Sequence, residues 1–274
     1  MATLSELTDA RELFQNLTLR ELRGKYKRSV LGWLWSLINP LATMAIFAIV
    51  FRFVLRIDPP RGDPSALKSY PFFLLSGLLA WNFLSAGMTG GMGSLLANGN
   101  LIKKVYFPRE ILTASVTASW AVQFCIELSV LAVALAFVGN VVVLWIPGVL
   151  LVLALQAVFV YGIGLALGAL VVYFRDVQHL VGIALQLWFY ATPVIYPVEY
   201  VPRVAQLSGY EIPFLRLYQL NPMVHFVEAY RDLLYDLRFP PAGSLAYMAG
   251  AALVSVAAGR AIFNRFEHRL AEEL

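Results

Sequence analysis

The chain has 274 residues, of which 59% are hydrophobic and only 14% charged, and its mean hydropathy is +0.70. A soluble protein of this length could not bury so much apolar sequence, so the composition predicts an integral membrane protein. The net charge of +4 is small, and no Lys/Arg run with interleaved aromatic residues indicates a nucleic-acid groove. The single cysteine, Cys125, excludes an intrachain disulfide and a cysteine metal cluster.

The first thirty residues predict a helix that lies on the membrane surface. Thr18 and Glu21 fit a capping box, in which two side chains satisfy free amides of a first helical turn. Basic residues between positions 20 and 28 then meet anionic headgroups. A cytoplasmic docking element explains the pattern about as well. We therefore expect an amphipathic, cytoplasmic or interfacial segment over residues 1–33 and a transmembrane domain over residues 34–274.

Six apolar segments follow, and an α-helix needs about 20 residues to cross a bilayer core. The predicted spans are residues 34–55, 70–97, 111–138, 144–173, 180–194 and 245–263. An even number of spans places both termini on one side. Lys and Arg number thirteen on that side and seven in the opposite loops. The sequence therefore predicts a multi-pass protein with both termini in the cytoplasm.

A short basic and aromatic connector, residues 100–112, joins the second and third spans. It carries five residues typical of a docking surface: Lys103, Lys104, Tyr106, Phe107 and Arg109. The connector is too short to fold as a domain. Its positive charge also marks the cytoplasmic side by itself, and composition alone favours that topological interpretation.

Within the spans, polar and small residues are few. Glu127 lies near the middle of the third span, with Gln123 one turn earlier on the same face. An ionisable group at this depth is costly and faces either a bundle interior or a wet path, and the sequence leaves both open. Two GxxxG pairs, Gly87 with Gly91 and Gly164 with Gly168, favour close helix packing within the chain.

The region between the fifth and sixth spans, residues 197–240, predicts a re-entrant or interfacial outer hairpin. Asn221 and Pro222 supply an N-cap and a first-turn proline for an amphipathic helix. Its predicted polar face includes Arg231 and Asp232. Tyrosines crowd the region, either as an interfacial belt or as a lining on which sugar rings stack.

Motifs for chemistry are missing from the sequence. It contains no GxxxxGK[ST] phosphate loop, its three histidines have no metal-ligand spacing, and no loop carries paired carboxylates. We therefore expect no catalytic, cofactor or metal site on this chain. The short link between the fourth and fifth spans carries Arg175 and Asp176, which fit a salt-bridged gate or a helix cap better than an enzyme site.

Four blocks, in order between residues 20 and 240, resemble one known family. They are residues 26–35 leading to Asn39-Pro40, the connector, Phe174–Val177 with residues 192–197, and Leu220–Met223 with Glu228-Ala229. The chain is similar to the membrane subunit of type-2 ABC exporters of cell-surface polysaccharide, the Wzm, TagG and KpsM-like group. Two other classes stay open: a permease for small molecules or drugs, and a membrane enzyme of glycolipid synthesis.

The resemblance implies a homodimeric pore in the bacterial plasma membrane that is not itself an enzyme. It implies two partner ATPase chains, which bind ATP and Mg²⁺, and a lipid-linked glycan or polyol-phosphate polymer as cargo, such as O-antigen, teichoic acid, capsule or galactan. The connector then couples the pore to the ATPase, and Arg175 with Asp176 forms an inner gate. A polymer path needs weak contacts at many places, and the candidate lining is Gln123, Glu127, Trp188, Tyr190 and Tyr196.

Overall fold

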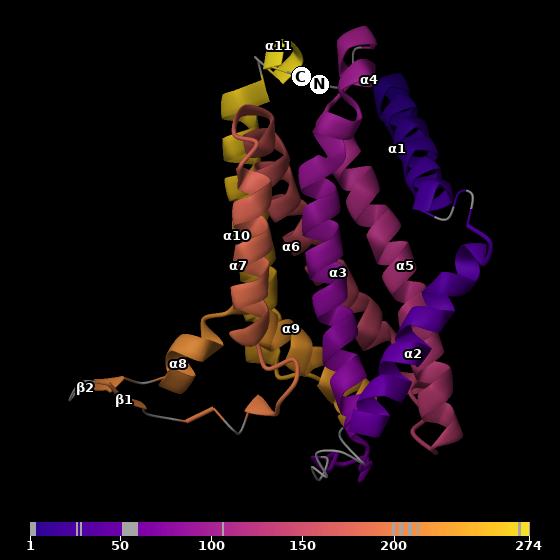
Figure 1. Cartoon of the computed structure of the whole chain (residues 1–274), viewed down its shortest axis with the longest axis vertical. Coiled ribbons are helices and arrows are strands. Elements are labelled where there is room, and N and C mark those ends of the chain that lie inside the picture. Colours follow the sequence, from indigo (N-terminus) through magenta and orange to yellow (C-terminus); the bar gives the residue numbers. More distant parts are fainter. Residues whose placement is uncertain are drawn as a thin grey trace.

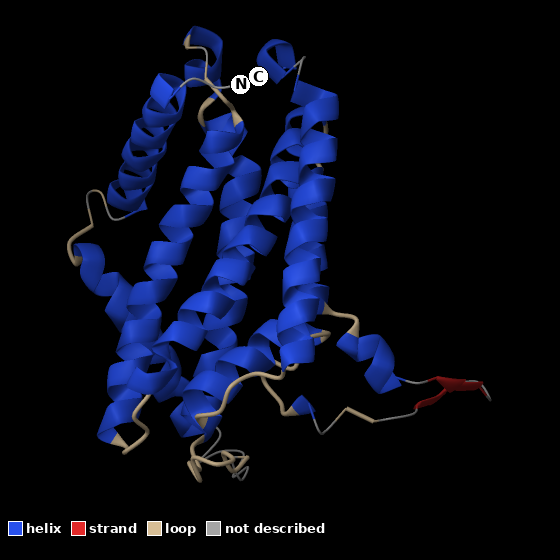
Figure 2. Ribbon diagram, turned by 180° about the vertical axis from the view of Figure 1, so that it is seen from behind, coloured by secondary structure: helices blue, strands red, loops and turns tan. Residues whose placement is uncertain are grey.

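The long helices of the chain run roughly parallel to one another and form a bundle, with shorter helices tilted or crossing at its ends (Figure 1). The computed structural model describes residues 4–25, 27, 29–50, 60–105, 107–198, 201–202, 205–207, 210–212, 214–267 and 270–273. These residues are helical apart from turns, loops and one two-stranded hairpin, as Figure 2 shows.

Four helices in the described part of the chain are long and apolar enough to cross a membrane. They are α3 (Tyr70–Ala97), α5 (Glu110–Phe137), α6 (Ile146–Tyr173) and α10 (Ala242–Phe266). A short 3-10 turn, η3 (Val143–Trp145), leads into α6. A 28-residue helix rises about 42 Å, which exceeds the bilayer core of about 30 Å. The prediction of an integral membrane protein is confirmed.

Two shorter helices lie against this set at the remaining predicted spans. The 15-residue α2 (Trp35–Ile49), preceded by η1 (Gly32–Leu34), packs on α3 and α5. The 14-residue α7 (Val177–Tyr190) packs on α3 and α6 and ends before Pro193. The part of the first predicted span beyond residue 50 lies outside the described residues.

Both termini lie at the same end of the bundle, which we call the terminal end (Figure 1). There α1 (Leu4–Lys25) packs along α5, and α4 (Gly99–Lys104) and α11 (Leu270–Glu273) close the bundle. A small apolar cluster that includes Leu17, Ile102, Leu112, Phe263 and Leu270 joins these elements. The predicted connector is therefore partly helical, because α4 occupies its first half.

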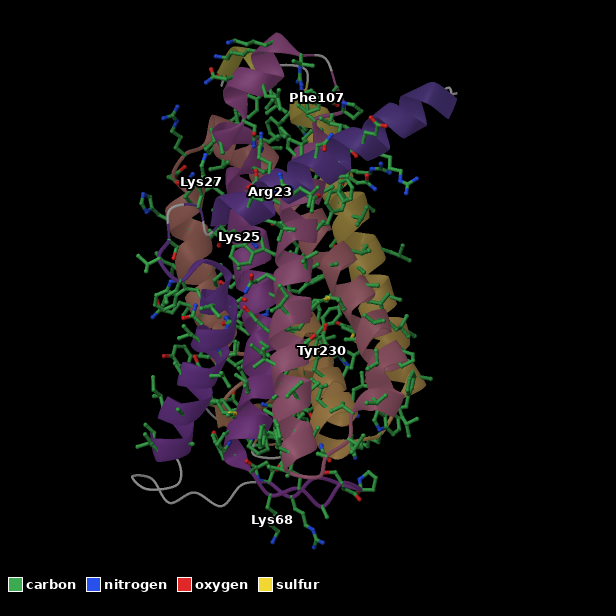
Figure 3. All side chains as sticks on the ribbon, turned by 90° about the vertical axis from the view of Figure 1, so that its right-hand side faces the viewer. Arg23, Lys25, Lys27, Lys68, Phe107 and Tyr230 are labelled. Atoms are coloured by element: carbon green, nitrogen blue, oxygen red, sulfur yellow. The ribbon has the colours of Figure 1, made fainter. Side chains whose placement is uncertain are left out.

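The main core lies between α3, α5, α6 and the helix α9 (Pro222–Arg231). The ring of Phe124 stacks on Phe83 at 5.1 Å and meets Tyr230 edge-on at 5.3 Å. Tyr230 is fully buried, and Figure 3 labels it well inside the bundle. These aromatic contacts tie α9 to two of the long helices.

The glycine pairs sit where α3 and α6 pack closely against each other. A Cβ on Gly91 would lie 3.1 Å from Gly164 Cα, and a Cβ on Gly87 would lie 2.6 Å from Val160 Cγ1. Alanine at either position would crowd α6, so glycine allows the two backbones to approach. The GxxxG pairs thus pack α3 on α6 within one chain, as the sequence predicted.

At the opposite end, which we call the hairpin end, the chain leaves the bundle after α7. The antiparallel strands β1 (Ala205–Leu207) and β2 (Tyr210–Ile212) extend to one side, followed by α8 (Phe214–Gln219), as Figures 1 and 2 show. Asn221 Oδ1 then accepts a hydrogen bond from Met223 N at 3.0 Å and starts α9, so the predicted N-cap is confirmed. A π-helical turn, η5 (Asp232–Asp236), ends the segment.

Candidate functional site

The connector at the terminal end presents two exposed cations. Lys103 and Lys104 form the last turn of α4, and both side chains are exposed. Tyr106, which the sequence places beside them, lies outside the described residues. Lysines at a helix C-terminus also interact favourably with the negative end of the helix dipole. The two ammonium groups therefore face solution on a short, ordered helix.

The second half of the connector is anchored to the bundle. Phe107 is half-buried and packs against the apolar cluster of the terminal end. Arg109 Nη1 donates a hydrogen bond to the backbone oxygen of Glu267 at 2.5 Å, just beyond α10. Arg260 Nη2 of α10 lies 3.3 Å from Glu110 Oε2 at the start of α5. A force applied to α4 would thus be transmitted to both α5 and α10.

The link between α6 and α7 carries Arg175 and Asp176, and both are exposed. Within the described residues no ion pair joins the two side chains, although they are adjacent in sequence. Asp176 is the N-cap residue of α7 without a side-chain capping bond, and its backbone oxygen accepts from His179 N at 3.0 Å. The structure therefore shows a tight backbone turn here, and the gate remains a prediction.

Gln123 and Glu127 lie one turn apart on α5, and Gln123 Nε2 donates to Glu127 Oε1 at 3.1 Å. Gln123 is buried and Glu127 is partly exposed. The last residue of α1, Lys25, reaches the same helix: its Nζ donates to Ser119 O at 3.2 Å. Figure 3 shows Lys25 beside the bundle, below Arg23 and Phe107.

Lys25 is held by aromatic and charged groups as well. Its Nζ lies 3.4 Å from the centroid of the Trp120 ring, which is a cation–π contact. Burial lowers the pKa of Lys25 to about 8, and the carboxylates of Glu127 and Glu21 act in the opposite direction. Lys25 could not be predicted as a buried residue because its partners on α5 lie about a hundred residues further along the chain.

The three candidate path residues of the fifth span and its exit come together in one pocket at the hairpin end. A pocket of about 680 Å³ is lined by Trp188, Tyr190 and Tyr196 together with Tyr218 and Asn221. The Tyr196 hydroxyl donates to Tyr190 O at 3.0 Å and is also hydrogen-bonded to the Tyr218 hydroxyl. The pocket thus offers aromatic faces together with hydroxyl groups.

Asn221 organises this pocket beyond its role as an N-cap. Its Oδ1 accepts from Trp188 Nε1 at 2.7 Å, while its Nδ2 donates to Ala191 O at 3.0 Å and Thr192 Oγ1 at 2.9 Å. One amide therefore joins the end of α7 to the start of α9. The sequence indicates the cap but gives no signal for these contacts across about 30 residues.

Arg231 at the end of α9 binds the segment that follows α7. Although predicted on the polar face of its helix, it is only 2% exposed. Its Nη1 contacts Glu228 Oε1 at 2.8 Å, its Nη2 donates to Val194 O at 2.7 Å, and its Cζ lies 3.8 Å from the Phe73 ring centroid. Asp232 is buried as well. The predicted polar face of this helix is therefore wrong at these two positions, which are buried because close neighbours in sequence neutralise the two charges: Glu228 for Arg231, and Arg238 for Asp232.

No group of three or more His, Cys, Asp or Glu side chains stands close enough to hold a metal ion in the part of the chain that the structure describes. The candidate site thus has three parts: exposed lysines on the anchored connector at the terminal end, the polar pair Gln123 and Glu127 on α5, and the aromatic pocket at the hairpin end. Such an arrangement can dock a partner and bind sugar-like groups weakly along the bundle.

A family profile described as ABC-2 type transporter matches residues 12–235. The chain belongs to this family. This ABC-2 transporter is similar to an O-antigen export system permease protein of Myxococcus xanthus, with 31% identity over 98% of both chains. It is also similar to an O-antigen export permease of Klebsiella pneumoniae (30% identity over 96% of this chain and 95% of the relative). A polysialic acid transport protein of Escherichia coli is 24% identical over 93% of both chains.

Proposed function

We propose that the chain is the pore-forming permease subunit of an ATP-driven exporter of a lipid-linked polysaccharide or polyol-phosphate polymer. The cargo moves from the cytoplasmic to the outer face of the bacterial plasma membrane. The observation that carries the proposal is the similarity to O-antigen export permeases over almost the whole chain. The long apolar helices and the family match are consistent with it.

In the proposed topology, α2 and α7 add two crossings to the four long helices, and the hairpin end forms a re-entrant outer element. The terminal end then faces the cytoplasm. This orientation is supported by the position of both termini, which lie at the same end as α4. The exposed Lys103 and Lys104 of α4 add positive charge to that end, as is typical of the cytoplasmic side.

The active unit is proposed to contain two copies of the chain and two ATPase chains that bind ATP and Mg²⁺. The connector fits the role of a coupling element because its cationic turn is exposed while Phe107 and Arg109 are anchored to the bundle. An ATPase that docks on Lys103 and Lys104 would pull on α5 and α10 through these anchors.

Cargo is proposed to pass Gln123 and Glu127 in the bundle and then the aromatic pocket of Trp188, Tyr190 and Tyr196. Aromatic faces bind sugar rings without a fixed hydrogen-bond pattern, which suits a long polymer that must keep moving. Arg175 and Asp176 would act at the inner mouth. If Arg175→Ala and Asp176→Ala each export at the wild-type rate, these two residues do not form a gate.

The function is tested by isolating the permease with its ATPase from the native membrane and identifying the lipids that come with it. We expect a lipid-linked glycan or polyol-phosphate polymer, enriched when the ATPase carries a substitution that binds but does not hydrolyse ATP. Matched preparations from cells unable to make the polymer serve as the control. Isolation of an intact transporter with no such lipid, but with a bound small molecule, would contradict the proposal.

A further inference from the structure

One face of α3 carries a row of polar side chains inside a membrane-crossing helix. Asn82, Ser85 and Thr89 follow at spacings of three and four, so they share one face. Asn82 and Thr89 are exposed and Ser85 is half-buried. Together with Ala86, Gly90 and Trp120 of α5 they line a hollow of about 490 Å³. We call these three residues the α3 polar row.

Other hydroxyl groups of α3 are satisfied by their own helix. Ser76 Oγ donates to Phe73 O at 2.8 Å, and Ser94 Oγ donates to Gly91 O at 2.7 Å. Within the described residues, the side chains of the α3 polar row make no hydrogen bond. A polar group without a partner is costly in hydrocarbon, so this face is expected to meet water, a polar ligand or a second copy of the chain instead of lipid chains.

The second wall of the hollow is fixed in place. A Cβ on Gly90 would lie only 2.7 Å from Trp120 Nε1, so the indole packs directly on the α3 backbone. The Lys25 ammonium also contacts the indole ring, 3.4 Å from its centroid. The hollow therefore has an aromatic flank, packed on α3, beside a row of amide and hydroxyl groups.

We propose that this hollow is a binding subsite for the hydroxyl groups of sugar residues in transit. An amide and two hydroxyls both donate and accept, which matches the hydroxyls of a sugar ring, and the indole offers an apolar flank to ring C–H groups. Thr89 lies eight residues from the end of α3, or about 12 Å of helix rise. The subsite is thus nearer the terminal end than the aromatic pocket. This inference rests on the proposed function and adds an earlier station on the same path.

Access from water is tested with single cysteines in a Cys125→Ala background of the complete transporter. We expect the Asn82→Cys and Thr89→Cys variants to react with a charged, membrane-impermeant thiol reagent. The reaction should slow several-fold when the cell supplies the polymer. The matched control is Leu253→Cys on α10, a position that is 70% exposed but apolar, and it should not react.

Two results would overturn the subsite. One is an absence of reaction at both positions, or a reaction rate that the polymer does not change. The other is efficient cross-linking of Asn82→Cys between two copies of the chain regardless of polymer, which would assign the α3 polar row to a contact between copies.

A second test uses nearly isosteric removal of hydroxyl groups. Loss of one hydrogen bond is worth about 0.5–1.5 kcal/mol, or roughly a 2- to 10-fold change. We expect Thr89→Val and Ser85→Ala each to slow export by such a factor while ATPase assembly stays unchanged. Ser129→Ala is the control, because Ser129 is exposed on α5 and its Oγ donates to Cys125 O of its own helix at 2.7 Å.

Failure of the proposed function and failure of the subsite give different results. If the wild-type chain does not restore polymer export to a deletion strain, the proposed function falls and the subsite falls with it. If the wild-type chain restores export and Thr89→Val and Ser85→Ala export at the wild-type rate, only the subsite is refuted.

Discussion

The contact between α6 and α10 predicts opposite outcomes for two glycines on one helix. A Cβ on Gly259 would overlap the backbone oxygen of Gly162, whereas a Cβ on Gly250 would meet no atom within 4 Å. Backbone atoms offer no rotamer by which to withdraw, so Gly259→Ala must push the two helices apart. Gly250→Ala only adds a methyl group in open space on the same helix.

The magnitudes follow from these distances. Overpacking costs about 1–3 kcal/mol, and the overlap with backbone places Gly259→Ala at the upper end. Both substitutions gain up to about 1 kcal/mol of helix propensity. Gly259→Ala should therefore lose about 2 kcal/mol of stability and Gly250→Ala should gain up to about 1. The expected difference between the two variants is about 3 kcal/mol.

Thermal unfolding of the purified permease, followed by tryptophan fluorescence in one detergent, measures this difference. At about 2–4 °C per kcal/mol, Gly259→Ala should unfold roughly 6–12 °C below Gly250→Ala. Export should fall in parallel in cells grown at high temperature. Equal unfolding temperatures for the two variants would refute the helix contact and the reasoning built on it.

Three further predictions concern function and pH. Charge reversal of both Lys103 and Lys104 to Glu should weaken copurification of the ATPase or uncouple hydrolysis from export, and unchanged binding, hydrolysis and export would exclude the coupling role. Alanine at both Tyr190 and Tyr196 should slow export severalfold with normal expression and ATPase assembly, because the pocket loses two aromatic rings and the hydroxyl that bonds Tyr218. Export at the wild-type rate in this variant would show that the polymer does not pass through the pocket. Burial raises the pKa of Asp236 to about 6 from an ordinary value of 3.8, so its protonated form is favoured in the folded protein. Its contribution to stability is then present below about pH 4 and lost as pH rises through 6, and Asp236→Asn should flatten this part of a plot of unfolding temperature against pH.

The membrane-crossing helices could be predicted from sequence because each is a long apolar run bounded by charges or prolines. The predicted range 70–97 coincides with α3, and the ranges 111–138 and 144–173 differ from α5 and α6 by at most two residues. The glycine pairs were equally informative, since their spacing reports close backbone approach directly. These patterns lie within short stretches of the chain, so they can be recognised from the sequence alone.

What could not be predicted depends on contacts between distant segments. Periodicity assigns Arg231 to a polar face, but Val194 and Phe73 reach it from other elements and bury it. Lys25 looks like one more surface cation until α1 is placed against Trp120. The residue types predicted the tyrosines of the aromatic pocket, but they did not predict that Asn221 joins α7 to α9.

The central claim is that this chain carries a lipid-linked polymer across the plasma membrane, and sidedness of the polymer tests it most directly. The chain is depleted from cells that continue to make the polymer, and intact spheroplasts are then treated with an impermeant glycan-cleaving enzyme. The account predicts that newly made lipid-linked polymer stays protected inside, and that re-expression of the chain with its ATPase makes it accessible. Polymer that remains fully accessible after depletion would contradict the account.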